Sequence, residues 1–201
     1  MNVLMVGVGG QGVILASDIL SEVVMASGYD IKKSDSIGMA QRGGSVVSNV
    51  RFGDKVYSPL IGAGEIDYLI GFEELEAARW APYLKKNGAA IVADVILVPL
   101  TVSKNAPYPE WEKTRDILGE YTDNVYLVPA LEIGAEIGNT RALNVVLLGF
   151  LSHFLDIKQE TWWENIKEKI PPRYVESSVR AFKRGALSAT KMISTVKEAK
   201  K

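Results

Sequence analysis

A glycine-rich segment with one embedded arginine is the part of this chain best suited to bind an anion. It reads Gly38-Met39-Ala40-Gln41-Arg42-Gly43-Gly44-Ser45 and leads directly into a β-branched run that begins at Val46. Glycines let the backbone approach a ligand closely, and the Arg42 guanidinium offers a planar set of donors suited to carboxylate or phosphate. The segment predicts a binding loop, whereas a mobile surface loop with a solvated arginine is the alternative. The expected binding residues are Met39, Gln41, Arg42, Gly43, Gly44 and Ser45.

A second glycine-rich loop, Gly7-Val8-Gly9-Gly10-Gln11-Gly12, matches the pattern G-x-G-x-x-G between a predicted strand and a predicted helix. In that context the glycines permit a tight turn, and the first N–H groups of the helix point at an anion. The binding residues expected here are Gly7, Gly9, Gly10, Gln11 and Gly12. A structural turn that binds nothing is the alternative.

The same pattern occurs in proteins that bind NAD or flavin. Such a site also needs an acidic residue at the end of the second strand. Asp35 is the candidate, but the residues before it, Ile31-Lys32-Lys33-Ser34, are poorly apolar for a central strand. A free-standing nucleotide-binding oxidoreductase therefore stays open as an alternative.

The sequence offers no complete catalytic set of its own. It has no cysteine, which excludes disulfides, cysteine-ligated zinc and an iron–sulfur cluster held by this chain alone. The one histidine, His153, lies in an apolar run and is predicted to be a packed or semi-exposed helix residue. Neither a Gly-x-Ser-x-Gly motif nor the thiamine-diphosphate pattern Gly-Asp-Gly followed by Asn is present. We therefore predict no catalytic residue and no metal ligand in this chain.

Glu73 and Glu74 follow a predicted buried strand, at the edge where open α/β sheets bind ligands. Acidic residues also stabilise the N-terminus of a helix through its dipole, and we favour that interpretation. Trp162-Trp163 and the apolar residues of the last predicted helix could form a partner-facing surface; those residues are Phe182, Leu187, Ile193 and Val196. Packing onto their own domain is the equal alternative.

Strands and helices alternate along the chain. This predicts one Rossmann-like α/β domain over residues 1–201, with a mostly parallel sheet covered by helices on both faces. Gly53-Asp54 predicts the turn of an inserted β-hairpin, and the region from roughly residue 141 onward is helical. The expected strands are 3–8, 29–33, 45–52, 55–58, 68–72, 89–93, 96–102 and 124–129, and the expected helices are 13–26, 73–85, 111–118, 130–137, 141–155, 160–170 and 174–201.

Composition and charge limit the kinds of partner that the chain can bind. The formal net charge is −1 over 201 residues, which argues against nucleic acid as the main partner because phosphate binding needs a concentrated basic face. The longest apolar stretch, 143–155, is too short to span a bilayer. No signal-peptide pattern precedes the first strand, so a cytoplasmic location is expected.

Several segments together resemble one family, the beta subunits of indolepyruvate:ferredoxin oxidoreductases. These correspond to the gamma subunit or domain of the wider 2-oxoacid:ferredoxin oxidoreductases. The most specific part is Gly-Met-Ala-Gln-Arg-Gly-Gly-Ser. The segments that carry the resemblance are Gly7–Gly12, Gly38–Ser48, Tyr57–Ile61, Tyr68–Glu73 and Gly138–Gly149.

The resemblance implies a heteromeric enzyme that converts indolepyruvate and other aryl 2-oxoacids oxidatively to acyl-coenzyme A, with ferredoxin as electron acceptor. Thiamine diphosphate and the iron–sulfur clusters are expected on a larger alpha subunit, so that the isolated chain is inactive. Arg42 and the backbone N–H groups of Gly9–Gly12 and Gly43–Ser45 would then contact phosphate or carboxylate groups at the subunit interface. Another 2-oxoacid (pyruvate, 2-oxoglutarate or a branched-chain acid) and a non-enzymatic interaction module stay open as alternatives.

Overall fold

The computed structural model of this chain describes residues 1–38, 43–98 and 107–199, with side chains described as far as residue 195. Within these residues a six-stranded sheet has the order β2-β3-β1-β4-β5-β6. Its strands are β1 (Asn2–Val8), β2 (Asp30–Ile37), β3 (Ser45–Gly53), β4 (Ile66–Gly71), β5 (Leu84–Ala93) and β6 (Asn124–Val128).

The helices are α1 (Val13–Ala26), α2 (Glu74–Arg79), α3 (Trp111–Gly119), α4 (Ala130–Glu136), α5 (Leu143–Ser152), α6 (Gln159–Lys169) and α7 (Pro172–Ala199). Short 3-10 turns, η1 (Ala81–Tyr83) and η2 (Thr140–Ala142), precede β5 and α5. The described helices include none that is long and apolar enough to cross a bilayer.

The sheet is mixed, with three parallel and two antiparallel strand pairings. Strands β1, β4, β5 and β6 run parallel, with Val3 opposite Tyr68 and Ile91 opposite Tyr126. Strand β3 pairs antiparallel with both β1 and β2. The apolar residues of β1, Val3 to Val6, are at most 1% exposed because both faces of the strand are covered. The α/β class and the mostly parallel sheet are as predicted.

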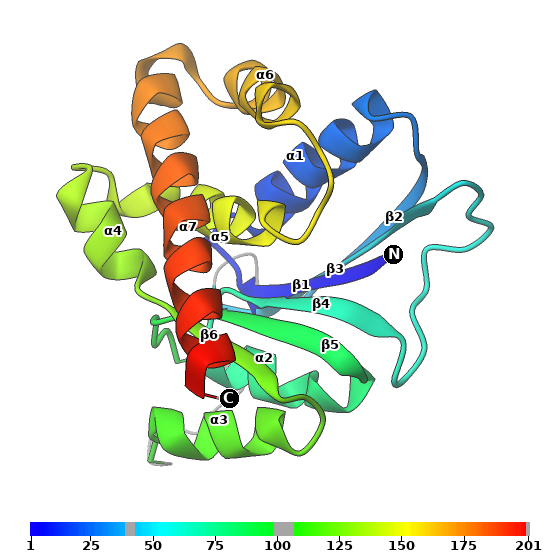
Figure 1. Cartoon of the computed structure of the whole chain (residues 1–201), viewed down its shortest axis with the longest axis vertical. Coiled ribbons are helices and arrows are strands. Elements are labelled where there is room, and N and C mark those ends of the chain that lie inside the picture. The colour runs from blue at the N-terminus through cyan, green and yellow to red at the C-terminus, as the bar shows by residue number, and fades with distance from the viewer. Residues whose placement is uncertain (39–42, 99–106, 200–201) are drawn as a thin grey trace.

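Two helical layers enclose the sheet (Figure 1). Helices α1, α5, α6 and α7 build the larger core on one face, around Leu20, Phe150 and Phe182. Helices α2 and α3 cover the other face, where Leu69, Val92 and Leu118 are buried. Most of the buried side chains in both layers are aliphatic or aromatic, so apolar burial stabilises each interface.

The prediction of a hairpin around Gly53-Asp54 is wrong about which strands pair. Residues 55–58 form no strand, and β3 pairs instead with β2. Both edges of β3 are already occupied, by β1 and β2, so the segment after Gly53 has no free strand edge to join. The antiparallel insertion exists, but it is the β2–β3 pair.

The predicted helix over 73–85 is shorter than expected. It ends at Arg79, and β5 already begins at Leu84. Pro82 in the intervening turn cannot donate a backbone hydrogen bond. Gly88, which follows the predicted helix, lies within β5, where an added Cβ would stand 2.8 Å from the backbone oxygen of Ile66. Of the predicted strand 96–102, residues 96–98 form no strand and the rest lies outside the described residues.

Candidate binding site at the glycine loops

The two glycine-rich loops lie against each other at the carboxyl end of β1. The N–H of Gly9 donates to the oxygen of Gly44 at 2.8 Å, and the N–H of Gly43 donates to the oxygen of Gly9 at 3.4 Å. This contact continues the β1–β3 pairing, in which Val8 stands opposite Ser45. The antiparallel β3 therefore brings together the segments that the sequence marks as binding elements. Met39, Gln41 and Arg42 lie outside the described residues.

The N-terminus of α1 opens into a cleft beside these loops. Its N-cap residue, Gly12, has φ +81° and provides no side-chain cap, and the first turn contains no acidic residue. The first-turn N–H groups have no intrahelical partner, and the helix dipole makes this end positive. A cleft of about 300 Å³ lies here, lined among others by Gly9, Gly10, Gly12, Leu15 and Val46. The geometry suits an anionic group.

Several donors predicted to face a ligand are already used inside the chain. Besides Gly9 and Gly43, the N–H of Gln11 donates to the oxygen of Val8 at 3.1 Å. The Ser45 hydroxyl donates to Glu76 Oε2 at 2.6 Å. These groups hold the loops in place, so the prediction that all of the loop amides face a ligand is too broad. The helix terminus at Gly12 is therefore a better candidate for an anion site than the loop N–H groups that donate within the chain.

Gly7 is required for close packing, and Gly12, whose φ is +81°, also lies close to a neighbouring side chain. A Cβ on Gly7 would stand 2.7 Å from Phe72 Cβ, and one on Gly12 would stand 2.8 Å from Asn144 Nδ2. At Gly10, with φ +108°, an added Cβ would meet no atom within 4 Å. Gly10 is therefore required for its backbone conformation, which side chains disfavour, and it leaves open space in front of the loop.

Asn144 and Arg141 line a second cavity next to the glycine cleft, although the sequence did not mark them as binding residues. The Asn144 side chain is 5% exposed, and its Nδ2 points to the oxygen of Gly12 at 3.5 Å. A second cavity of about 210 Å³ is lined among others by Leu15, Arg141, Asn144 and Tyr174. Leu15 borders both cavities. The run Gly138–Gly149, which carries part of the family resemblance, was the available signal for these residues.

Glu73 caps α2, as the helix-terminus interpretation predicted. Its carboxylate accepts from the N–H of Glu76 at 2.8 Å and from the hydroxyl of Tyr108. Glu74 is 5% exposed, and its Oε2 is buried without a hydrogen-bond partner. Burial and the neighbouring Glu73 and Asp94 carboxylates raise the pKa of Glu74 to about 7. No group of three or more His, Asp or Glu side chains among the described residues could hold a metal ion.

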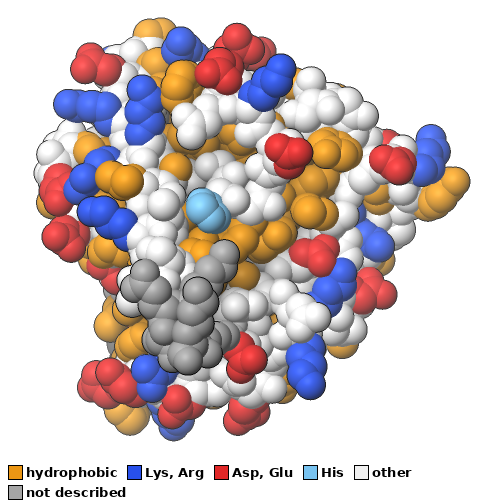
Figure 2. Space-filling model, viewed as in Figure 1, with side chains coloured by type: hydrophobic (Ala, Val, Ile, Leu, Met, Phe, Trp, Pro, Cys, Tyr) orange, Lys and Arg blue, Asp and Glu red, His pale blue; other side chains and the backbone are white. Residues whose placement is uncertain are grey.

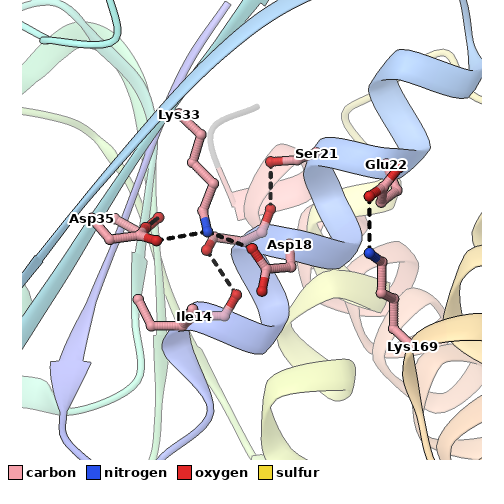
Figure 3. A network of polar contacts seen from close by, with 9 residues as sticks. Ile14, Asp18, Ser21, Glu22, Lys33, Asp35 and Lys169 are labelled. Atoms are coloured by element: carbon pink, nitrogen blue, oxygen red, sulfur yellow. Dashed lines mark hydrogen bonds and ion pairs between the residues drawn. The ribbon is translucent and has the colours of Figure 1, made fainter.

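Asp35 does not occupy the position that a dinucleotide site requires. Strand β3 lies between β1 and β2, so the strand that carries Asp35 is not the neighbour of β1. Its carboxylate accepts from Lys33 Nζ at 2.8 Å and from the Ser48 hydroxyl at 2.6 Å. Figure 3 shows Lys33 between Asp35 and Asp18, so that Lys33 ties β2 to α1 through Asp18 while Asp35 holds Lys33 within its own strand.

The other residues that the sequence marked are the histidine in the apolar run and the apolar residues of the last two helices. His153 follows α5 as its C-cap residue and is exposed, with its ring edge-on to Phe154 at 5.6 Å. His153 is therefore exposed and lies just outside the helix, whereas a packed or semi-exposed helix residue was predicted. Trp162 is fully buried and packs against Phe182 at 5.4 Å between ring centroids. Both residues therefore pack onto their own chain rather than face a partner, whereas Leu187 is 46% exposed.

The profile of the pyruvate ferredoxin/flavodoxin oxidoreductase family matches residues 2–188. The chain is 34% identical over 197 residues to indolepyruvate oxidoreductase subunit IorB of Pyrococcus horikoshii, covering 96% of this chain and 98% of that protein. It is 37% identical over 188 residues to the subunit of the same name from Archaeoglobus fulgidus, covering 92% and 93%. The 2-oxoglutarate synthase subunit KorC of Methanothermobacter thermautotrophicus is 29% identical, with 89% of each chain covered.

Solved structures share the fold. The gamma subunit of a keto/oxoacid ferredoxin oxidoreductase from Geobacter sulfurreducens superposes with a TM-score of 0.69 at 21% identity, covering 94% of this chain and 98% of that one. The 2-oxoglutarate:ferredoxin oxidoreductase of Magnetococcus marinus gives a TM-score of 0.74 at 19% identity, covering 95% of this chain but 31% of that one. The same fold thus occurs both as a separate chain and as part of a longer polypeptide.

Proposed function

Since this chain belongs to the pyruvate ferredoxin/flavodoxin oxidoreductase family, we propose that it is the subunit of an indolepyruvate:ferredoxin oxidoreductase that holds neither thiamine diphosphate nor iron–sulfur clusters. The assignment of indolepyruvate as the substrate rests on sequence identity, compared between relatives named for different oxoacids. Relatives named for indolepyruvate are 32–37% identical over at least 92% of the chain, whereas those named for 2-oxoglutarate are 26–29% identical. The absence of cysteine from the 201 residues supports placing the clusters on a partner subunit.

The reaction cleaves the bond between the carboxyl and carbonyl carbons of an aryl 2-oxoacid. It releases carbon dioxide, transfers the acyl group to the sulfur of coenzyme A and passes two electrons to ferredoxin. Thiamine diphosphate on the larger subunit supplies the carbanion chemistry, and protein groups bind and orient the reactants. This chain's share is the cleft at Gly10 and Gly12, where the uncapped N-terminus of α1 would hold a phosphate or carboxylate group. A cytoplasmic location stays a prediction from the sequence.

Reconstitution with the larger subunit tests the assignment. We expect indolepyruvate-dependent reduction of ferredoxin or a dye, dependent on coenzyme A, with neither subunit active alone. The substrate assignment fails if kcat/KM for 2-oxoglutarate or pyruvate exceeds that for indolepyruvate. A non-enzymatic interaction module is favoured if no oxoacid supports turnover by a complex that contains its thiamine diphosphate and clusters.

A substitution of Arg42 tests whether this residue contacts the coenzyme A or the oxoacid. We expect Arg42→Ala in the assembled enzyme to raise KM for coenzyme A or for the oxoacid, since hydrogen bonds to charged groups contribute about 1.5–3 kcal/mol. Arg115→Ala is the matched control, because Arg115 lies on α3 with its side chain 58% exposed beside Asp116. Unchanged kinetics for both ligands in Arg42→Ala would remove Arg42 from the site.

The nucleotide-binding alternative predicts a different result. Titration of the isolated chain with NADH and FAD should give no micromolar binding, because β3 separates β1 from the strand that carries Asp35. Clear micromolar binding of either cofactor would favour the free-standing oxidoreductase instead.

A further inference from the structure

Strand β2 forms an open edge of the sheet. It stands first in the strand order, and its only strand partner among the described residues is β3. Figure 1 shows it at the margin of the sheet, beside α1. It runs over 8 residues, Asp30–Ile37, without a proline and in unbroken register with β3. Proteins commonly protect such an edge with a proline, a bulge, a very short strand or charged side chains, and β2 has only the charges.

Alternate residues of β2 direct their backbone groups away from β3. The N–H of Gly38 donates to the oxygen of Ser45 at 3.0 Å, so every second residue counted back from Gly38 bonds to β3. The residues between them point their N–H and C=O groups outward, namely Ile31, Lys33, Asp35 and Ile37. Within the described chain, the only partner of these outward groups is Lys32 Nζ, which donates to the oxygen of Ile31 at 3.2 Å. The edge can therefore accept another strand.

A second copy of β2, running antiparallel, is complementary to this edge in one register. When Ser34 of the two copies stand opposite each other, Lys33 is opposite Asp35 of the second copy, and Ile31 is opposite Ile37. Opposite charges and apolar β-branched residues are favourable cross-strand pairs. The next registers that use the outward groups place Lys33 opposite itself or Asp35 opposite itself, and like charges directly opposite are destabilising. The charges that would repel other strands thus select one pairing with a second copy.

The side chains that would pair are partly accessible. Ile37 is 60% exposed, and the side chains of Lys33 and Asp35 are 19% and 28% exposed. Lys33 and Asp35 lie on the α1 side of the strand, where Lys33 also contacts Asp18 (Figure 3). The formal net charge is −1, and Figure 2 shows basic and acidic side chains intermixed around the margin of one face. Two copies therefore repel each other only weakly as whole molecules.

We propose that the β2 edge is a self-association surface, at which two copies of this chain pair their β2 strands antiparallel about a two-fold axis through Ser34. Such an isologous contact uses the same surface on both copies and closes as a dimer. It would join the two sheets through the hydrogen bonds of Ile31, Lys33, Asp35 and Ile37. The association does not depend on the proposed function.

A single introduced cysteine tests the register, since the chain has no cysteine of its own. The backbone groups of Ser34 bond to β3, so the two Ser34 residues would form a non-hydrogen-bonded pair with Cα atoms about 4.5 Å apart. That separation lies within the range of a disulfide. We expect Ser34→Cys to give a disulfide-linked dimer in the presence of oxidised glutathione, seen on a non-reducing gel.

Ser36→Cys is the matched control for this linkage. Ser36 is exposed on the same face of the same strand, but in the proposed register it stands opposite Lys32 of the second copy rather than opposite itself. It should therefore stay unlinked under the same conditions. Linkage of Ser36→Cys that equals or exceeds that of Ser34→Cys overturns the proposal, and so does the absence of any linked dimer of Ser34→Cys.

The dimer dissociation constant, measured by analytical ultracentrifugation of the full chain, tests the charge pairing. Asp35→Lys places two lysines opposite each other at both symmetric contacts, and we expect Kd to rise at least about tenfold. Asp116→Lys makes the same change of charge on α3, where the Asp116 side chain is 76% exposed, and should leave Kd unchanged. Thermal unfolding verifies that both variants are folded, and the cysteine test stands if Asp35→Lys is not. A monomeric wild type, or equal Kd values for Asp35→Lys and wild type, overturns the proposal.

Discussion

The side-chain amide of Gln11 donates to the backbone oxygen of Phe72 at 2.7 Å, and its carbonyl oxygen accepts from the N–H of Val8 at the same distance. One side chain thus satisfies polar backbone groups at the carboxyl ends of β1 and β4. Phe72 is fully buried, and its own N–H donates to the oxygen of Val6 at 2.8 Å. The polar residue of the glycine motif therefore fixes the loop to the sheet. Its side chain makes these contacts with the protein itself, although the sequence predicted a contact with the ligand.

Gln11→Ala should accordingly lower the stability of the free chain. The change leaves the N–H of Val8 and the oxygen of Phe72 without their partner, and each unsatisfied buried group costs about 1–3 kcal/mol. We expect a loss of that order in the free energy of unfolding, measured by urea denaturation. Gln159→Ala is the control, at the exposed first residue of α6, and it should change stability by less than about 0.5 kcal/mol. Equal effects of the two changes would contradict this role for Gln11.

Long apolar elements were predictable from the sequence alone. The helix predicted over 13–26 is α1 with the same bounds, and the strand predicted over 3–8 is β1 without its first residue. The strand is an apolar run broken only by Gly7, and the helix has apolar residues on most of its faces, so local preference agrees with burial in both. The end of α2 was missed although Pro82, two residues after Trp80, is a local signal against a continuing helix. The start of β5 depends on the parallel pairing of Leu84 with Ile66, a tertiary contact that no local signal reports.

The site was predictable in position but not in detail. Glycine patterns located both loops. Their hydrogen bond through Gly9 and Gly44 depends on the antiparallel pairing of β3 with β1, which the hairpin prediction had misassigned. The proximity of Asn144 to Gly12 joins residues 132 positions apart, and a single sequence contains no direct information about such a contact. The internal use of Gln11 and Ser45 was missed for the same reason.

The contact between α5 and α7 predicts a strong effect of small substitutions. A Cβ on Gly149 would stand 2.1 Å from the oxygen of Phe182, and one on Gly185 would stand 2.0 Å from the oxygen of Val146. Gly149→Ala or Gly185→Ala has to push the helices apart, and overpacking of this kind costs about 1–3 kcal/mol or more. Gly119→Ala is the control, because an added Cβ there meets no atom within 4 Å. Thermal unfolding should separate the variants, and a Tm for Gly149→Ala equal to that of Gly119→Ala would refute the close approach.

The ion pairs of Lys33 should contribute a salt-dependent share of stability. Its Nζ lies 2.5 Å from Asp18 and 2.8 Å from Asp35, joining β2 to the helix whose N-terminus opens into the cleft (Figure 3). Burial lowers the pKa of the Lys33 ammonium, but its bonds to both carboxylates raise it by more, so the group stays charged at neutral pH. Because the carboxylates are partly exposed, we expect Lys33→Met to cost only about 1 kcal/mol at low salt.

High salt should reduce that cost, because screening weakens exposed ion pairs. The measurement is urea denaturation at low and at molar sodium chloride, with Lys86→Met, at an exposed position on β5, as the control. An effect of Lys33→Met that is the same at both salt concentrations would assign the loss to packing of the lysine stem rather than to charge.

The raised pKa of Glu74 predicts that the free energy of unfolding decreases between acidic and neutral pH. Burial is the main cause that raises its pKa from 4.5 to about 7, and the charges of Glu73, Asp94, Glu110 and Glu112 add to it. Between these pH values the native state holds a proton that the unfolded state has released, so the free energy of unfolding falls as pH rises. A difference of this size corresponds to an upper bound of about 3 kcal/mol. The loss is complete above the native pKa and absent below the unfolded one.

Glu74→Gln removes this titration and should flatten the stability profile in that window. At pH 8 we expect the variant to be more stable than the wild type, because the wild type then holds a buried carboxylate with an unpartnered Oε2. At pH 4.5 the two proteins should differ little. Glu112→Gln, on the exposed side of α3, controls for the loss of one negative charge. Urea denaturation of all three proteins from pH 4.5 to 8 measures the effect, and parallel profiles for wild type and Glu74→Gln would show that Glu74 titrates normally.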